Sequence, residues 1–265
     1  MKQKLVFTDL DGTLLDHHNY SFAPASKALA LLKEKNIPLI LTTSKTLAEI
    51  KELQKELDNE HAPSIAENGS VIFIPANSFE NSEEQIVTLG KSRSEIVEAI
   101  NAFPSYLRKN ITGFSDMSTQ DICNHTGLPQ DKAGLAANRH GSEPFLWSGN
   151  EEELDTLKSM LAEQNIRLIK GGRFVHALGQ TDKVDGMTYL AQKYKALWST
   201  DNIDTIALGD GPNDKAMLLA AGTGIAIPNK YGVSINFECS APNIIHAQKQ
   251  GPAGWNKEIK NWLEN

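Results

Sequence analysis

Residues 5–13 read Leu-Val-Phe-Thr-Asp-Leu-Asp-Gly-Thr, a short apolar run that ends in two carboxylates, a glycine and a hydroxyl. Side chains alternate along a strand, so the pattern predicts that Asp9 and Asp11 leave a buried strand on the same side. Two carboxylates so close repel each other unless a divalent cation or an electropositive ligand lies beside them. Gly12 would let the chain turn back there. The alternative is an acidic surface turn, because short motifs also recur by chance.

The composition is that of an ordinary globular protein, with 265 residues and a formal net charge of -7. This length predicts one large or two modest domains. The negative charge argues against binding nucleic acid or an anionic membrane, so an anionic substrate must meet locally placed cations and a metal. The two cysteines, Cys123 and Cys239, indicate neither a disulfide scaffold nor a thiolate zinc site. We see no signal-peptide or membrane-spanning pattern and expect a cytoplasmic enzyme.

Two further segments repeat the order of strand, polar loop and helix. Residues 37–41 predict a buried strand that runs into Thr42-Thr43-Ser44-Lys45-Thr46, and the spacing of Thr46 and Glu49 predicts a capping box at the start of a helix. Residues 205–208 predict another buried strand, followed by Gly209-Asp210-Gly211-Pro212-Asn213-Asp214. Such units favour parallel strands with right-handed crossovers, and open α/β sheets place their sites at the carboxyl ends of those strands.

Polar residues of three kinds follow these strands or begin the next helix. The Thr43 hydroxyl stands where a helix N-terminus can bind an anion, although it also fits a hydroxyl that only caps the helix. Lys183 is expected at a helix start, where the macrodipole disfavours a cation unless an anion is bound. Asp210 and Asp214 fall on one strand-to-helix turn. Acids are common there, but together with Asp9 and Asp11 they predict a Mg²⁺ site.

From about residue 85 the pattern changes to a separate α+β sequence. It predicts a strand at 86–89, helices to about residue 138, a strand at 144–147, a helix at 151–164 and a hairpin over 166–178 around Gly171-Gly172. We therefore expect an inserted domain of residues 85–177 between the two parts of an α/β core, residues 1–84 and 178–265.

Taken in order, four features of the chain resemble the four motifs of the haloacid dehalogenase-like phosphatases: Asp9-Leu-Asp-Gly-Thr-Leu14, Thr43, Lys183 and residues 209–214. The resemblance implies an α/β fold with a Rossmann-like parallel-sheet core and an inserted α+β cap of the C2 type found in Cof-like members. It implies Mg²⁺ held by Asp9, the Asp11 carbonyl, Asp210 and Asp214. It also implies that Asp9 is the nucleophile, that Asp11 is the general acid and base, and that Thr43 and Lys183 hold the phosphate.

Several segments are similar to mannosyl-3-phosphoglycerate phosphatases, namely Thr43-Ser44-Lys45-Thr46, residues 113–117, residues 139–145 and residues 171–176. A substrate with a glycerate carboxylate and sugar hydroxyls needs an arginine or a backbone nest for the carboxylate and acids for the hydroxyls. Arg139, Arg173 and Glu143 are candidates, although solvated surface charges are the alternative for each. Further substrate-side candidates are Ser44, Lys45, Glu67 and Asn213, and Glu67-Asn68-Gly69 also fits a plain hairpin turn.

The resemblance implies hydrolysis of mannosyl-3-phosphoglycerate to mannosylglycerate through an aspartyl-phosphate. A Cof-like phosphatase for other sugar phosphates, a phosphomutase, and a catalytically silent sugar-phosphate-binding protein are the alternatives, and the intact motif residues argue against the last. We expect a small phosphorylated sugar or glycosyl-glycerate as the partner, with no nucleic acid and no membrane. The protein itself is expected to be a monomer or a homodimer.

Overall fold

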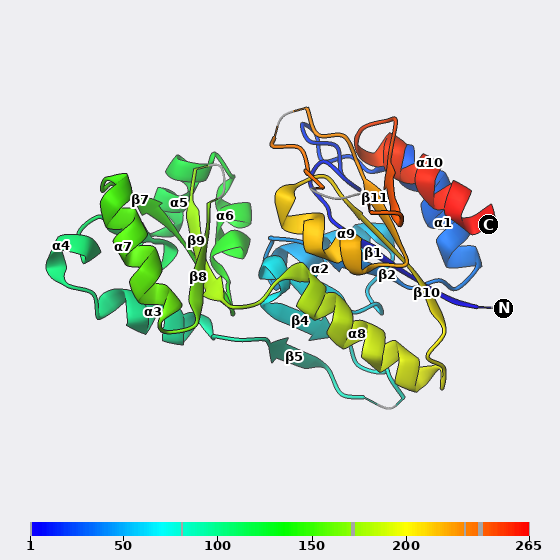
Figure 1. Ribbon diagram of the computed structural model, residues 1–265, viewed down its shortest axis with the longest axis horizontal. Helices are drawn as coiled ribbons and strands as arrows, with labels where there is room; N and C mark the ends of the chain where they lie inside the picture. The colour runs from blue at the N-terminus through cyan, green and yellow to red at the C-terminus, as the bar shows by residue number, and fades with distance from the viewer. Residues whose placement is uncertain (1, 81, 171–172, 231, 238–240, 265) are drawn as a thin grey trace.

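The computed structural model describes residues 2–80, 82–170, 173–230, 232–237 and 241–264. Two sheets lie side by side along the long axis of the molecule (Figure 1). The larger has eight strands in the order β12-β11-β10-β1-β2-β3-β4-β5. Their bounds are β1 Gln3–Thr8, β2 Leu39–Thr42, β3 Ser64–Ala66, β4 Val71–Ile74, β5 Gln85–Thr88, β10 Ile203–Gly209, β11 Thr223–Ala226 and β12 Ile244–His246.

The order of the strands places the motif-bearing loops together. Strands β12 to β3 run parallel, and β4 and β5 are antiparallel additions at one edge. From β1 the chain proceeds to β2 and β3 on one side and later to β10, β11 and β12 on the other. The sheet therefore reverses its winding between β1 and β10, and the crevice at such a switch point is where open α/β sheets bind ligands.

Strand β1 is buried on both faces, which explains its apolar run. Leu5 and Phe7 pack on one face against helices α8 (Lys183–Leu197) and α9 (Lys215–Ala220). Val6 packs on the other face against α1 (Ser26–Glu34), α2 (Leu47–Leu57) and α10 (Gly251–Glu264). Trp255 of α10 is fully buried, and its indole N–H donates to the Thr8 hydroxyl at 2.9 Å. The core is thus a sheet between two layers of helices, as predicted.

The four-stranded sheet lies between β5 and α8 in the sequence, with the antiparallel order β6-β7-β9-β8. Phe145 and Ala177 on one face pack against Ile96 of α3 and Leu157 of α7. The elements are β6 Ile111–Gly113, β7 Ser142–Trp147, β8 Ile166–Lys170, β9 Val175–Gly179, α3 Arg93–Asn101, α4 Ser105–Arg108, α5 Thr119–Thr126, α6 Gln130–Ala137 and α7 Glu151–Ala162. Gly171-Gly172, the predicted turn of the hairpin, lie outside the described residues.

We propose that the two sheets are the centres of two domains, a core and a cap. The expected strand at 86–89 is present as β5, but β5 pairs with β4 in the larger sheet, so the chain leaves that sheet after Thr88. It returns after Gly179, the last residue of β9. The sequence pattern did not predict β6, whose three residues are too few to show a period.

The two crossings between the sheets touch each other. Gly90 adopts φ +78°, and a Cβ placed on Gly179 would lie 2.7 Å from the Lys91 nitrogen. Only glycine allows the two backbones to approach so closely. The two crossings therefore form one narrow connection between the sheets.

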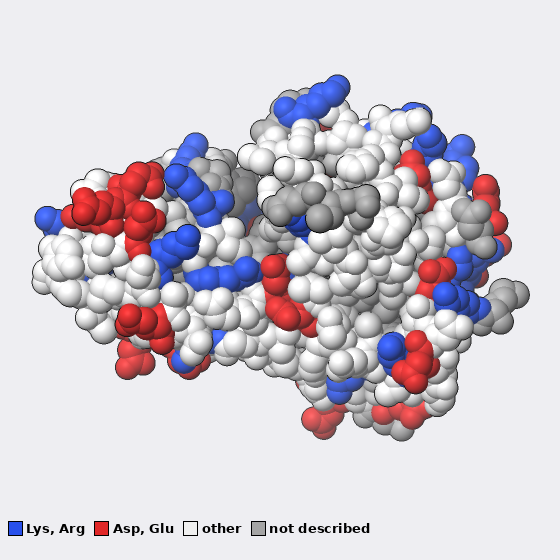
Figure 2. Space-filling view, viewed as in Figure 1, with Lys and Arg blue, Asp and Glu red and all other residues white. Residues whose placement is uncertain are grey.

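None of the helices in the described part of the chain is long and apolar enough to cross a membrane. Lys and Arg side chains are interspersed with Asp and Glu over the face shown in Figure 2.

Candidate active site

A buried lysine joins the carboxyl ends of β1 and β10. Lys183 has no exposed surface, and its Nζ donates to Asp9 Oδ1 and to Asp214 Oδ1, each at 2.6 Å. Asp9 directly follows β1, and Asp214 ends the 3₁₀ turn Pro212–Asp214 after β10. Lys183 is the first residue of α8, and Asp182 is its N-cap, so the predicted helix start is confirmed. Three of the sequence motifs thus meet in one ion-paired cluster.

Asp210 completes an acidic group beside this cluster. Its Oδ1 accepts a hydrogen bond from the Thr13 hydroxyl at 3.1 Å, and its Oδ2 accepts one from the Asn229 amide at 2.7 Å. Asp214 Oδ2 in turn accepts from the backbone nitrogens of Asp210 and Gly211 at 3.0 and 2.9 Å. Asp9, Asp210 and Asp214 are all buried, and each offers a carboxylate oxygen within 4.8 Å of the others. Such a group of oxygen ligands suits a hard divalent cation.

The pKa values of Asp9, Asp210 and Lys183 are all raised, which indicates an excess of negative charge in the site. Burial raises the pKa of Asp9 well above its usual range, and the charges of Asp214 and Asp210 raise it further, against the opposing effect of Lys183. Burial and the neighbouring Asp214 raise the pKa of Asp210 to about 6. For Lys183 burial acts to lower the pKa, but Asp214 and Asp9 outweigh it and the pKa is raised. One lysine faces three carboxylates, so the donor set fits a bound Mg²⁺.

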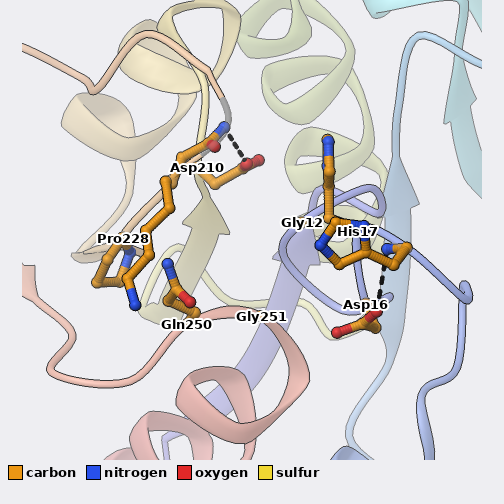
Figure 3. Close-up of a pocket in the computed structure, with 10 residues that line it drawn as sticks. Gly12, Asp16, His17, Asp210, Pro228, Gln250 and Gly251 are labelled. Atoms are coloured by element: carbon orange, nitrogen blue, oxygen red, sulfur yellow. Dashed lines mark hydrogen bonds between the residues drawn. The ribbon is translucent and has the colours of Figure 1, made fainter.

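A small pocket of about 80 Å³ borders Asp210 (Figure 3). Gly12, Asp16 and His17 line one side of it, and Pro228 lies with Asp210 on the other. Gly12 has φ +80°, and a Cβ there would lie 2.4 Å from Asp210 Oδ2. The turn predicted at Gly12 therefore also serves close contact between the loops after β1 and β10.

The loop after β2 carries the predicted anion-binding residues. Thr43 is buried, and its hydroxyl accepts a hydrogen bond from the Lys45 nitrogen at 3.2 Å. The capping box is confirmed, with Thr46 and Glu49 each accepting from the other's backbone nitrogen. Ser44 is partly buried in the same loop. The hydroxyl and the helix start are thus both present where an anion site was expected.

Lys45 forms an ion pair with Asp11 that the motifs did not predict. The Lys45 Nζ lies 2.7 Å from Asp11 Oδ2 and 5.3 Å from the centre of the Tyr20 ring. Burial acts to lower the pKa of Lys45, but the charge of Asp11 outweighs it and the pKa is raised. The other carboxylate oxygen, Asp11 Oδ1, is buried and has no hydrogen-bond partner among the described residues. Lys45 therefore lies beside the second aspartate of the first motif.

Asn213 and Glu67 lie in two different loops, and the turn Glu67–Gly69 is in contact with both Asn213 and the insert. The Asn213 amide donates to Asn68 Oδ1 at 3.1 Å, which connects the loop after β10 to the turn Glu67–Gly69 between β3 and β4. Glu67 is 1% exposed, and its carboxylate accepts hydrogen bonds from the backbone nitrogens of His140 and Gly141 in the insert. The Glu67 carboxylate therefore binds the insert and is not exposed to solvent.

The three insert residues predicted to bind substrate do not share one environment. The Arg139 side chain is 7% exposed, and its Nη1 lies 3.8 Å from Glu67 Oε2 and donates to the Ser142 hydroxyl at 2.8 Å. Its Nε has no hydrogen-bond partner in the part of the chain that the structure describes. Glu143 is also buried, and it accepts from Arg93 Nε at 2.7 Å and from the Ser115 nitrogen at 2.6 Å. Arg173 is exposed. Of the three, Glu143 has both of its oxygens engaged by the insert itself.

Sequence reasoning missed the residues that hold these side chains in place. Thr13 is part of the quoted Asp-Gly-Thr stretch, so its contact with Asp210 could have been sought from the motif. Asn229 carries no motif, and only the parallel order of β10 and β11 brings it to Asp210. Arg93 and Ser142 are likewise identified only by their contacts, Arg93 with Glu143 inside the insert and Ser142 with Glu67 of the core.

Comparisons with known proteins identify the class. A family model described as haloacid dehalogenase-like hydrolase matches residues 6–231. The chain belongs to this family and is an enzyme, a hydrolase.

Among its relatives is a protein of Persephonella marina named glucosyl-3-phosphoglycerate/mannosyl-3-phosphoglycerate phosphatase. It is 36% identical over 265 aligned residues, which cover 96% of this chain and 95% of that protein. A protein of Methanococcoides burtonii with the same name is 36% identical over 270 aligned residues, covering 98% and 97%. The fold is similar to the sucrose-phosphatase of Synechocystis solved with sucrose and phosphate, with a TM-score of 0.62, 16% identity and 99% of each chain covered.

The acidic group predicts that Mg²⁺ stabilises the protein. A ligand that binds only the folded state at a hundred times its dissociation constant raises the free energy of unfolding by about 2.7 kcal/mol. We expect Asp210→Asn to lose most of this gain while being no less stable than the wild type in EDTA, because the substitution removes a repelled buried carboxylate. Thermal unfolding with Mg²⁺ and with EDTA measures both effects.

Asp204→Asn is the control for this experiment. Its carboxylate is partly exposed and forms an ion pair with Lys4, at 3.7 Å. It should retain the full Mg²⁺ gain. An Asp210→Asn protein stabilised by Mg²⁺ as much as the wild type would place the metal elsewhere.

His176 in β9 predicts a pH dependence of stability. Burial and the charge of Arg139 lower its pKa to about 3, whereas an unfolded histidine titrates near 6.5. The unfolded chain therefore binds the proton first, so this stabilisation is present above about pH 6.5 and is lost as the pH falls toward 3, by up to about 1.4 kcal/mol per pH unit. Urea unfolding should show a shallower slope for His176→Gln between pH 6.5 and 4, and parallel slopes would contradict the assignment. The exposed His125→Gln should follow the wild type.

Proposed function

We propose that this phosphatase of the haloacid dehalogenase-like family hydrolyses mannosyl-3-phosphoglycerate to mannosylglycerate and phosphate, with Mg²⁺ as its cofactor. The observation that carries the chemistry is Lys183 bridging Asp9 and Asp214 at the switch point of the sheet. The observation that carries the substrate is the full-length similarity to the two phosphatases named for glucosyl- and mannosyl-3-phosphoglycerate.

The first step uses the two aspartates after β1. Asp9 attacks phosphorus, a new bond forms between its carboxylate oxygen and phosphorus, and the bond from phosphorus to the sugar-glycerate oxygen breaks. Asp11 enters this step protonated on Oδ1 and gives that proton to the leaving oxygen. Its buried and unpartnered Oδ1 is the oxygen available for this role, because Oδ2 accepts from Lys45. The products of the step are an aspartyl-phosphate and a neutral alcohol.

In the second step, water hydrolyses the aspartyl-phosphate. Asp11 takes a proton from water, the water oxygen attacks the aspartyl-phosphate, and the bond between Asp9 and phosphorus breaks. Thr43 and Lys183 hold the phosphate oxygens through both steps, and Asp214 holds Lys183 in place. Phosphoryl transfer depends mainly on such positioning and charge neutralisation.

Mg²⁺ would be held by Asp9, the Asp11 carbonyl and Asp210, with Asp214 beside them. The cation would neutralise the phosphate charge that the carboxylate of Asp9 must approach. The excess of carboxylates over lysine in this cluster fits such a role.

Substrate groups beyond the phosphate are assigned to the cap. Arg173 and Arg139 are the candidates for the glycerate carboxylate, since a guanidinium matches a carboxylate in a bidentate pair. Ser44, Lys45 and Asn213 border the phosphate-binding residues and would contact the near part of the substrate.

Asp9→Asn tests the nucleophile. We expect the rate with Mg²⁺ to fall by at least about a thousandfold, which corresponds to about 4 kcal/mol of lost transition-state stabilisation, because an amide oxygen attacks phosphorus poorly. Phosphate release from the substrate measures this. Asp201→Asn, whose carboxylate is fully exposed, should retain the wild-type rate. More than a tenth of the rate remaining in Asp9→Asn would exclude covalent catalysis by this residue.

Arg173→Ala tests the substrate assignment within a panel of phosphate esters that includes glycosyl-3-phosphoglycerates. We expect it to lower kcat/KM for the glycerate-bearing ester by about tenfold or more, because a charged hydrogen bond contributes about 1.5–3 kcal/mol. Activity on 4-nitrophenyl phosphate should stay unchanged. Lys170→Ala is the matched control, a cation at the end of β8 that is also exposed. An equal fall on both esters would show that Arg173 does not recognise the glycerate.

A further inference from the structure

Glu67 connects the core to the cap through three hydrogen bonds. It belongs to the core, yet both of its carboxylate oxygens accept hydrogen bonds from the cap. Oε1 accepts from the His140 nitrogen at 2.8 Å, and Oε2 accepts from the Gly141 nitrogen at 3.1 Å and from the Ser142 hydroxyl at 2.6 Å. The side chain is 1% exposed. A buried carboxylate with three donors is a strong and geometrically specific contact.

The backbone of Glu67 is held in an unfavourable conformation. Glu67, Asn68 and Gly69 have φ values of +50°, +57° and +97° in succession, and the left-handed region is uncommon for glutamate. The Glu67 nitrogen donates to the Lys45 carbonyl, and the Asn68 nitrogen donates to the Thr43 carbonyl, each at 2.9 Å. Such a conformation persists only where surrounding contacts impose it.

The same three residues border the phosphate-binding side chains. Asn68 accepts a hydrogen bond from Asn213, as described above. Gly69 lies against the start of α8, where a Cβ would come within 2.0 Å of the Asp182 carbonyl and 2.8 Å of the Lys183 nitrogen. The turn that presents Glu67 is therefore fixed against the loops that carry Thr43, Lys183 and Asn213.

On the cap side, residues 140–142 are fixed just as firmly. Ser142 is the first residue of β7. The His140 carbonyl accepts from the Arg93 nitrogen at 2.7 Å, where α3 begins. A hydrogen bond to this loop thus holds the sheet and the first helix of the cap together.

We propose that Glu67 is a positioning residue that sets the orientation of the cap over the phosphate-binding side chains. Resting on the proposed function, it aligns a substrate that spans both sheets, because groups held by the cap then lie at a fixed distance from Asp9. A phosphate ester too small to reach the cap does not use this alignment. Precise alignment of reacting groups is worth large factors in rate.

Glu67→Gln breaks the contact with little change in side-chain volume. An amide nitrogen replaces one carboxylate oxygen and faces a donor of the cap loop, so at least one buried N–H or O–H loses its acceptor. We expect hydrogen exchange in a peptide covering residues 138–143 to become at least about tenfold faster, since these backbone N–H groups lose protection. Peptides from β1 and α8 should exchange as in the wild type.

The kinetic arm uses two esters of different size. We expect kcat/KM for mannosyl-3-phosphoglycerate to fall by about ten- to a hundredfold in Glu67→Gln, and kcat/KM for 4-nitrophenyl phosphate to stay within about threefold. A residue needed only for folding would lower both alike.

Glu52→Gln is the matched control. Glu52 is also a core glutamate that meets the cap, through an ion pair with Lys132, but its side chain is 45% exposed. Exposed ion pairs contribute little. Exchange and both rates should therefore stay at wild-type values.

Unchanged exchange at 138–143, or an equal fall on both esters, would overturn the proposal. Should the wild type not hydrolyse mannosyl-3-phosphoglycerate, the proposed function fails while the exchange experiment still decides the role of Glu67. Should Glu67→Gln not fold, Ser142→Ala removes one donor from the cap side, and a smaller change in the same exchange and kinetic readouts is expected. Wild-type exchange and rates in Ser142→Ala would then count against the proposal.

Discussion

The site depends on one buried cation. Lys183 is placed at a helix start, without exposure to water, and is ionised only because Asp9 and Asp214 lie 2.6 Å from it on two sides. Removing Lys183 would leave two buried carboxylates without their cation, which is far more costly than the intact ion pairs are favourable. The arrangement of β1, β10 and α8 is therefore constrained by this cluster as much as by the apolar contacts of the sheet. In the mechanism that we propose, the same contacts position the groups that meet phosphorus.

The remaining carboxylate of the cluster, Asp210, lies beside the ion pairs that Lys183 forms. Asp210 is buried next to Asp214 and Asp9, and its raised pKa records the cost of that position. Thr13 and Asn229 donate to its two oxygens and fix their directions without neutralising the charge. A fold selected for stability alone would not keep three acids within 4.8 Å. The repulsion among these buried carboxylates is concentrated at the switch point of the sheet, where a charged ligand and a divalent cation would relieve it.

The core and its site could be predicted largely from the sequence because the relevant signals are local. The runs before Asp9 and Asp210 are buried strands, the capping box of Thr46 and Glu49 forms as expected, and Lys183 begins a helix. The cap was less predictable because its contacts join residues distant in the chain. Nothing near Glu67 in the sequence indicates that its hydrogen-bond donors lie 73 to 75 residues away, and a four-residue strand such as β5 carries no sign of which sheet it joins.

The close approach of Gly90 and Gly179 also bears on how the chain folds. The larger sheet takes its strands from before and after the insert, so β10 can pair with β1 only after the intervening chain has returned to the same point. Closing a disordered loop of roughly 90 residues would cost about 4 kcal/mol in chain entropy. A cap that forms first brings its two ends together and reduces that loop to a short bridge. The folded insert then acts as a short covalent link, and it holds the two parts of the larger sheet close together although they are far apart in the sequence.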